Sequence, residues 1–165
     1  MHLQHYIILD AAKMGYRIDE AKRFNDDHKC LYKGDAEQSL YHVAPWLFTF
    51  ELDSSFAEWY LASSGQQNWG IIVESEADMK TLYLHFKKFL WVQTEFNKKL
   101  YFRFYDPRVL PTFLETSELE QLTEFYGPVH KFIIESNNGQ IMEYELKGQQ
   151  LQKQPNNLFK QITNI

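Results

Sequence analysis

The chain has 165 residues, 44% apolar and 24% charged, which is typical of one globular domain with its own core and excludes a disordered chain. The net charge is −5 and no Lys/Arg cluster exceeds a pair, which argues against a nucleic-acid partner. The single cysteine, Cys30, excludes an internal disulfide framework and favours a reducing compartment. Aromatic residues make up 16% of the chain and can serve a core or an interface.

Nothing in the sequence predicts export or a membrane span. Residues 1–5 lack the charged and apolar regions of a signal peptide. The longest apolar stretch, residues 43–50, is interrupted by Pro45 and Thr49 and is far too short to cross a bilayer. We therefore expect a cytoplasmic protein with no membrane partner.

The first half of the chain predicts short strands that alternate with helices. Apolar runs predict strands at residues 5–10, 30–32, 44–52 and 69–74. Helical patterns lie between these runs, at residues 11–24, after Asp35 with Gln38 three positions on, and after the capping-box pair Ser55 and Glu58.

The second half begins with the clearest helix, in which apolar residues recur at helical spacing over residues 79–90, with Ser75 and Asp78 as its cap. Two strands follow, at residues 91–96 and 100–105. Asp106 and Pro107 predict the start of a further helix, and Ser117 with Glu120 the start of the next, which Gly127 and Pro128 end. A hairpin is expected at residues 131–146 around Asn137-Asn138-Gly139, followed by a loosely held tail from residue 155. The expected fold class is α/β, a mixed β-sheet flanked by helices, with a smaller C-terminal helical lobe plus a β-hairpin.

Motifs of known catalytic or cofactor sites are missing from the sequence. It contains no GxSxG elbow, phosphate-binding loop, GxGxxG or HExxH, and we expect no cofactor and no metal site. Cys30 and His28 could form a nucleophile and base, but a buried cysteine on a strand is the favoured interpretation.

Residues 101–110 (YFRFYDPRVL) carry the densest pattern in the chain. On a strand, Tyr101, Arg103 and Tyr105 would share one face, so that rings flank the guanidinium. Two interpretations remain for the charged residues Asp10, Arg103, Asp106 and Arg108. They form either an active-site cluster or, as we favour, structural ion pairs and a helix cap that pin two strand ends together.

The remaining aromatic residues divide between core and surface. Trp69 before Gly70 at a strand start predicts a ring that lies over a close backbone approach, within the core. Periodicity does not assign a second group of rings, which are the candidate partner-binding residues: Trp46, Trp59, Trp91, Phe113, Phe125 and Tyr126.

Five blocks, in the same order and with similar spacing, resemble domain-of-unknown-function family 4123 (DUF4123). They are YIILDAA, CLY, VAPWLFTF, NWGIIVES and above all FRFYDPRVL. The resemblance runs from about Tyr6 to Pro128 and implies one adaptor domain over residues 1–128, with a helical lobe at about 107–127. Residues 129–165 are then a hairpin and tail packed on the same domain. The matching positions include Asp10, Tyr32, Pro45, Trp69, Gly70, Arg103, Tyr105, Asp106, Pro107 and Arg108.

The resemblance implies a non-catalytic function. Members of the family act as adaptor chaperones in bacterial type VI secretion, where they hold a toxic effector and help to load it onto the spike protein. The expected partners are therefore a cognate secreted effector and the spike protein, and the matching positions have a structural role. Cargo contact is then expected on variable surface, including the helical lobe from Pro107 to Tyr126 and the terminal hairpin.

Two other hypotheses stay open at this point. The first is a small enzyme that acts on an anionic substrate through Asp10, Asp106 and the two arginines, since carboxylates paired with arginine can be tuned for acid–base chemistry. The second, weaker one is a nucleic-acid module built on stacking aromatic rings, against which the acidic balance counts.

Overall fold

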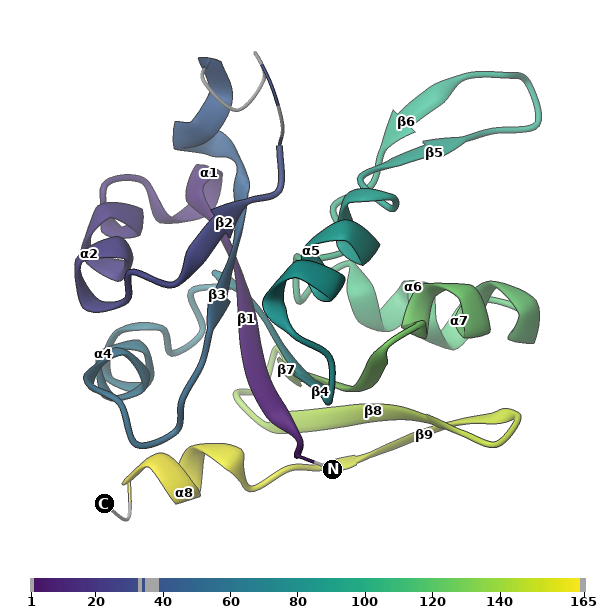
Figure 1. Cartoon of the computed structure of the whole chain (residues 1–165). Helices are drawn as coiled ribbons and strands as arrows, with labels where there is room; N and C mark the ends of the chain where they lie inside the picture. The colour runs from purple at the N-terminus through teal and green to yellow at the C-terminus, as the bar shows by residue number, and fades with distance from the viewer. Residues whose placement is uncertain (1, 33, 35–38, 164–165) are drawn as a thin grey trace.

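The computed structural model describes residues 2–32, 34 and 39–163, and an antiparallel sheet runs through its centre (Figure 1). Within these residues seven strands form this sheet, and each neighbouring pair is antiparallel. Their spatial order is β2 (His28–Cys30), β3 (Pro45–Thr49), β1 (Gln4–Asp10), β4 (Gly70–Ser75), β7 (Val129–Glu135), β8 (Ile141–Lys147) and β9 (Gln150–Pro155). The central strands β1 and β4 are buried on both faces, which explains their continuous apolar runs.

Helices cover both faces of the sheet, and the expected fold class is confirmed in this respect (Figure 1). One layer contains α1 (Ala11–Met14), α2 (Arg17–Phe24), α4 (Ser55–Ser63) and α8 (Leu158–Thr163). The other contains α5 (Met79–Lys87), α6 (Leu110–Thr116) and α7 (Leu119–Tyr126). A short 3-10 helix, η1 (Tyr41–Val43), precedes β3.

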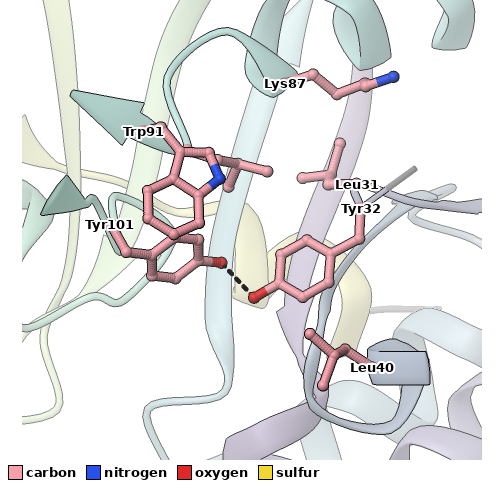
Figure 2. Close-up of a pocket in the computed structure, with 7 residues that line it drawn as sticks. Leu31, Tyr32, Leu40, Lys87, Trp91 and Tyr101 are labelled. Atoms are coloured by element: carbon pink, nitrogen blue, oxygen red, sulfur yellow. Dashed lines mark hydrogen bonds between the residues drawn. The ribbon is translucent and has the colours of Figure 1, made fainter. Parts of the chain in front are cut away.

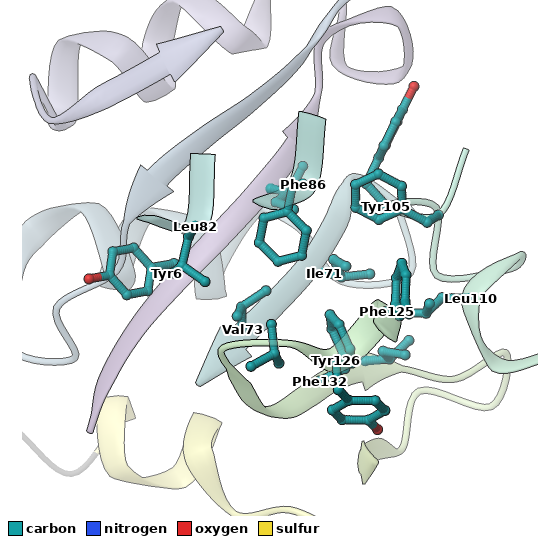
Figure 3. Close-up of a cluster of buried hydrophobic side chains, with 14 of the residues drawn as sticks. Tyr6, Ile71, Val73, Leu82, Phe86, Tyr105, Leu110, Phe125, Tyr126 and Phe132 are labelled. Atoms are coloured by element: carbon teal, nitrogen blue, oxygen red, sulfur yellow. The ribbon is translucent and has the colours of Figure 1, made fainter. Parts of the chain in front are cut away.

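Two cores lie on the two faces of the sheet because side chains alternate along each strand. Ile7 on β1 belongs to the core under α1, α2 and α4, whereas Ile8 belongs to the core under α5, α6 and α7. The second core is built largely of rings, and Figure 3 shows Phe86, Phe125 and Phe132 among them. The centroids of Phe125 and Phe132 are 5.2 Å apart. Each fully buried ring contributes about 1.5–3 kcal/mol of hydrophobic stabilisation.

The close backbone approach predicted at Gly70 is present. A Cβ atom at this position would lie 1.8 Å from the carbonyl oxygen of Ile8 on the paired strand β1. Trp69 is 5% exposed, and its carbonyl oxygen accepts a 2.8 Å hydrogen bond from the backbone N–H of Asp10. Only glycine fits here without moving one of the two central strands.

Helix caps differ from the expected ones by a few residues. Asp78, and not Ser75, caps α5 by accepting a hydrogen bond from the backbone N–H of Thr81, because the Ser75 hydroxyl is turned to the carbonyl oxygen of Pro128. For α7 the capping box is formed by Glu118 and Gln121, one position after the expected pair Ser117 and Glu120. The cap expected at Asp35 and Gln38 lies outside the described residues.

The strands expected at residues 91–96 and 100–105 are shorter than predicted. They are β5 (Trp91–Gln93) and β6 (Lys99–Tyr101), which pair with each other in a separate two-stranded sheet. After β6 the chain turns, so Arg103 and Tyr105 are not on a strand, and α6 begins at Leu110 rather than at Pro107. The Asp106 carbonyl oxygen accepts hydrogen bonds from Val109 and Leu110, which completes the turn before the helix.

The C-terminal part is more ordered than the expected tail. The hairpin of β7 and β8 is present around Asn137-Asn138-Gly139, and β7 joins the sheet beside β4. The prediction of a loosely held tail is wrong for α8, because Leu158 and Ile162 are only 4% and 2% exposed and lie in the core beside α4. Their i, i+4 spacing is the apolar stripe of a short helix. The expected domain boundary near residue 128 stays a prediction.

Candidate functional site

The charged residues predicted to pin two strand ends lie where β1 meets the turn after β6. Asp10 is 2% exposed, ends β1, and accepts a 3.0 Å hydrogen bond from the backbone N–H of Ala12 at the start of α1. Its second carboxylate oxygen forms an ion pair with Arg103. Burial raises the pKa of Asp10, an effect that Arg103 and the backbone N–H groups oppose.

Asp106 forms the second ion pair of this region. Arg108 donates to both of its carboxylate oxygens, at 3.0 Å from Nε and 2.8 Å from Nη2, and the Arg108 backbone N–H donates a third bond. Burial opposes ionisation of Asp106, but these bonds outweigh it and hold its pKa below the usual value. Each aspartate is therefore paired with its own arginine. This arrangement agrees with the interpretation of these residues as structural ion pairs. We define Asp10, Arg103, Asp106 and Arg108 as the ion-pair junction.

A chain of tyrosine hydroxyl groups extends from the ion-pair junction toward the surface. The Tyr32 hydroxyl donates to that of Tyr101 at 2.8 Å, and Tyr101 and Tyr105 hydroxyls are 2.9 Å apart. The Arg103 guanidinium carbon lies 5.4 Å from the Tyr105 ring centre. Burial raises the pKa of Tyr101 and of Tyr105, so both stay protonated and act as hydrogen-bonding links. These tyrosine hydroxyl groups connect the segment after β2 to the end of β6.

An apolar pocket of about 420 Å³ opens at the outer end of this tyrosine chain (Figure 2). Leu31, Tyr32 and Leu40, from the segment after β2, form one wall. The opposite wall is formed by residues at the end of α5 and in the β5–β6 sheet: Lys87, Leu90, Trp91 and Tyr101. The Trp91 ring packs edge-on against Tyr101 at 5.1 Å, and the Tyr101 hydroxyl points across to Tyr32 (Figure 2). The volume suits a large apolar side chain or a small ligand.

Residues 91–100 form a hairpin that projects away from the body of the molecule (Figure 1). Its first residue, Trp91, lines the pocket. Each of these residues is exposed apart from Thr94. Backbone hydrogen bonds close the hairpin internally, from Thr94 N–H to the Lys98 oxygen at 2.8 Å and, at its base, from Phe102 N–H to the Leu90 oxygen at 2.8 Å. We call residues 91–100 the projecting hairpin.

The projecting hairpin carries apolar side chains on both faces. Trp91 lines the pocket, whereas the paired Val92 and Leu100 point to the opposite face, and Phe96 lies at the turn. Their exposures are 51% for Trp91, 40% for Val92, 84% for Phe96 and 50% for Leu100. A two-stranded hairpin is at best marginally stable in water, and clustered exposed apolar side chains mark interaction surfaces.

The segment that contains the projecting hairpin is basic although the chain is acidic. Residues 84–103 contain five basic residues and one acidic residue, against a net charge of −5 for the chain. Among the described residues, none of Lys87, Lys88, Lys98 and Lys99 takes part in a salt bridge. The Lys99 amino group lies 5.1 Å from the Trp91 ring centre, so a cation and an apolar ring are presented together.

A protein-family model described as "Domain of unknown function (DUF4123)" matches residues 5–124. The chain belongs to this family. The matched residues include both ion pairs, the tyrosine chain, the pocket and the projecting hairpin. Comparisons with curated proteins and with solved structures gave no match.

In this DUF4123 chain, the other positions that match the family blocks are packed within the fold. Pro45 is buried and lies opposite Asp10 in the β1–β3 pair, and Pro107 is buried in the turn after Asp106. Trp69 is covered by Arg17, whose guanidinium carbon lies 5.2 Å from the ring centre. These positions support the sheet and the ion-pair junction.

The expectation of a partner surface is wrong for three of the six candidate rings, which are buried: Trp46, Phe125 and Tyr126. Phe125 and Tyr126 are 0% and 4% exposed, because they lie on the inner face of α7, and the Tyr126 hydroxyl donates to the Tyr144 carbonyl oxygen at 2.9 Å. Phe113 is half-buried against Phe125, with ring centres 5.0 Å apart.

The tryptophans of the group differ among themselves. Trp46 is 8% exposed, and its indole N–H donates to the Tyr41 carbonyl oxygen at 3.0 Å. Trp59 is half-buried in a stack with Trp69, with ring centres 5.8 Å apart. Trp91 is the member of the group whose ring is exposed. Sequence reasoning did not find the other pocket residues Leu31, Leu40, Lys87 and Leu90, because nothing in their spacing brings them together.

Two further properties follow from the described residues. No group of three or more His, Cys, Asp or Glu residues among them is placed to hold a metal ion. Their helices are all too short or too polar to cross a membrane. Chemically, the site offers an apolar cavity with a hydroxyl chain at one end and lysines at its rim.

Proposed function

We propose that the chain is an adaptor chaperone that binds a specific toxic effector and helps to load it onto the spike protein of a bacterial type VI secretion system. Membership of DUF4123, together with the role that this family resemblance implies, supports the proposal. The observation that carries it is the projecting hairpin, whose exposed rings lie beside an apolar pocket. The adaptor acts in the cytoplasm, before secretion, and uses neither a cofactor nor nucleic acid.

The projecting hairpin suits a protein that holds another protein. A chaperone has to cover apolar surface on its cargo until the cargo is handed over, which requires matching apolar surface of its own. Large rings at the centre of such a surface provide most of the binding energy, and the surrounding polar groups provide orientation. Trp91 and Phe96 have the exposure that this role needs.

We also propose that the chain is not an enzyme. An enzyme of the kind considered above would need Asp10 or Asp106 in contact with substrate. Among the described residues, both carboxylates are nearly buried, both are paired with arginine, and neither lines the apolar pocket or the three more polar ones. This geometry favours a structural role for the ion-pair junction.

Co-expression with the effector encoded beside this chain's gene tests the proposal. We expect the effector to stay soluble, to co-purify with the chain, and to be secreted only when the chain is present. Secretion of an unrelated effector through the same system serves as the control and should not depend on the chain. Normal solubility and secretion of the cognate effector without this chain would contradict the proposal.

A further inference from the structure

We propose that the projecting hairpin and the adjoining apolar pocket form the surface that holds the effector, through an acidic amphipathic segment of that effector. This inference rests on the proposed adaptor function and assigns the surface and the chemistry of the partner. Among the eleven large apolar residues that are exposed in the described part of the chain, four lie within residues 91–100. This concentration distinguishes the hairpin from the scattered exposed side chains elsewhere.

The pocket determines what the partner must carry. Its walls are leucines and rings, and its volume of about 420 Å³ is open beside Trp91. An aliphatic or aromatic side chain of the partner would fill it and bury Trp91, while a second apolar side chain would cover Phe96. A segment with apolar residues on one side and polar residues on the other meets both requirements.

The charged residues near this surface determine which charge the partner segment should carry. Lys87 lines the pocket and the Lys99 amino group lies 5.1 Å from the Trp91 ring centre, and each has a second lysine beside it in the sequence, Lys88 and Lys98. The described residues provide no salt bridge for any of these four lysines. An effector segment with Asp and Glu beside its apolar residues complements this rim. A second copy of this chain in a symmetric dimer would instead place lysine against lysine.

Binding of the purified effector to hairpin variants tests the surface. We expect Trp91→Ala and Phe96→Ser each to weaken effector binding at least tenfold, because they remove the central apolar contacts. The double variant Lys88→Glu/Lys98→Glu should slow association several-fold and reduce its dependence on salt. Tyr16→Ser is the matched control, since Tyr16 is 76% exposed but lies between α1 and α2, away from the projecting hairpin in the sequence. This variant should bind the effector as tightly as the wild-type chain does.

A photoreactive benzoylphenylalanine in place of Phe96 tests the chemistry of the partner. The cross-linked effector peptide should contain more Asp and Glu than Lys and Arg, and at least two large apolar residues. Cross-links to a basic segment, to the spike protein or to a second copy of this chain would overturn the inference.

The outcomes separate this inference from the proposed function. If the wild-type chain binds the effector and the hairpin variants bind equally well, the surface is misassigned while the adaptor function stands. If the wild-type chain does not bind the effector at all, the proposed function fails and the inference fails with it. Retained spike binding by the variants would confirm that they are folded.

Discussion

Residues 91–100 and residues 101–110 follow each other directly, and both carry large apolar side chains, but their environments are opposite. Phe104 and Tyr105 are completely buried, whereas Phe96 is 84% exposed. The second segment is held by the Asp10–Arg103 ion pair and the tyrosine chain. Among the described residues, the first segment forms hydrogen bonds only within itself and at its base. The same kind of ring therefore stabilises the fold in one segment and is exposed on the surface in the next.

The largest effect is expected in the central sheet that supports the buried segment. Gly70→Ala should lower the free energy of unfolding by about 4 kcal/mol or more, because the new Cβ atom would lie 1.8 Å from the Ile8 carbonyl oxygen. Urea unfolding followed by circular dichroism measures the change. Gly65→Ala is the control, since a Cβ at Gly65 meets no described atom within 4 Å, and it should change stability by less than about 0.5 kcal/mol. Equal stability of both variants would contradict the close approach.

Arg103→Ala should break the anchoring of the buried segment. It leaves the Asp10 carboxylate buried without its charge partner, and we expect a loss of about 1–3 kcal/mol. The loss is limited because the Arg103 side chain is 40% exposed and solvent screens the pair. Lys153→Ala breaks the exposed pair with Glu115 and should cost less than about 0.5 kcal/mol in the same thermal and urea unfolding experiments. Unchanged stability together with loss of an activity on an anionic substrate would favour the enzyme hypothesis instead.

The buried layer should also respond to pH through His85. This residue lies on α5, is 6% exposed, and its Nε2 is 2.6 Å from the Phe125 carbonyl oxygen. Burial lowers the pKa of His85, against the opposing effect of this hydrogen bond. Because the unfolded chain then takes up the proton more readily, stability should fall as pH drops below about 6.5, until the folded pKa is passed.

Urea unfolding between pH 5 and pH 8 measures this dependence. His85→Gln should flatten the fall in stability between pH 6.5 and the lower folded pKa, whereas His42→Gln, at an exposed position, should leave it intact. A fall of the same steepness in His85→Gln would assign it to other groups.

The smallest effect on stability is expected in the projecting hairpin. Replacing both exposed rings, Trp91→Ser/Phe96→Ser, should change the free energy of unfolding by less than about 1 kcal/mol, because the rings are 51% and 84% exposed and neither belongs to one of the two cores. Hydrogen exchange should show the hairpin amides exchanging much faster than those of β1 and β4. A loss comparable with that of Arg103→Ala would show that the hairpin supports the fold.

The sequence was sufficient for features that depend on local chemistry. The hairpin around Asn137-Asn138-Gly139 and the glycine at position 70 each follow from what a backbone can adopt. The YFRFYDPRVL pattern together with Asp10 indicated a group of ion pairs, without showing which aspartate pairs with which arginine. The strand ends and caps were displaced by a few residues, because tertiary contacts such as Ser75 with Pro128 compete with local ones.

Exposure could not be predicted in the same way. Trp91 and Phe125 are both large rings in mixed surroundings, but one lies on a hairpin that leaves the sheet and the other faces β7 from α7. Phe125 is buried and Trp91 is exposed because α7 packs on the sheet and the projecting hairpin does not. The pocket depends on segments about 60 residues apart, which no spacing rule brings together.

At the base of the projecting hairpin Trp91 pairs with Tyr101, and the Phe102 backbone N–H donates a hydrogen bond to the Leu90 carbonyl oxygen. Ten residues beyond it contribute no strand to the main sheet. A hairpin of different length or sequence can therefore be transplanted onto the same two positions without repacking either core. Under the proposed adaptor function, residues 91–100 would then be a replaceable segment that sets partner choice, and a chimera would need only the exchange of that segment.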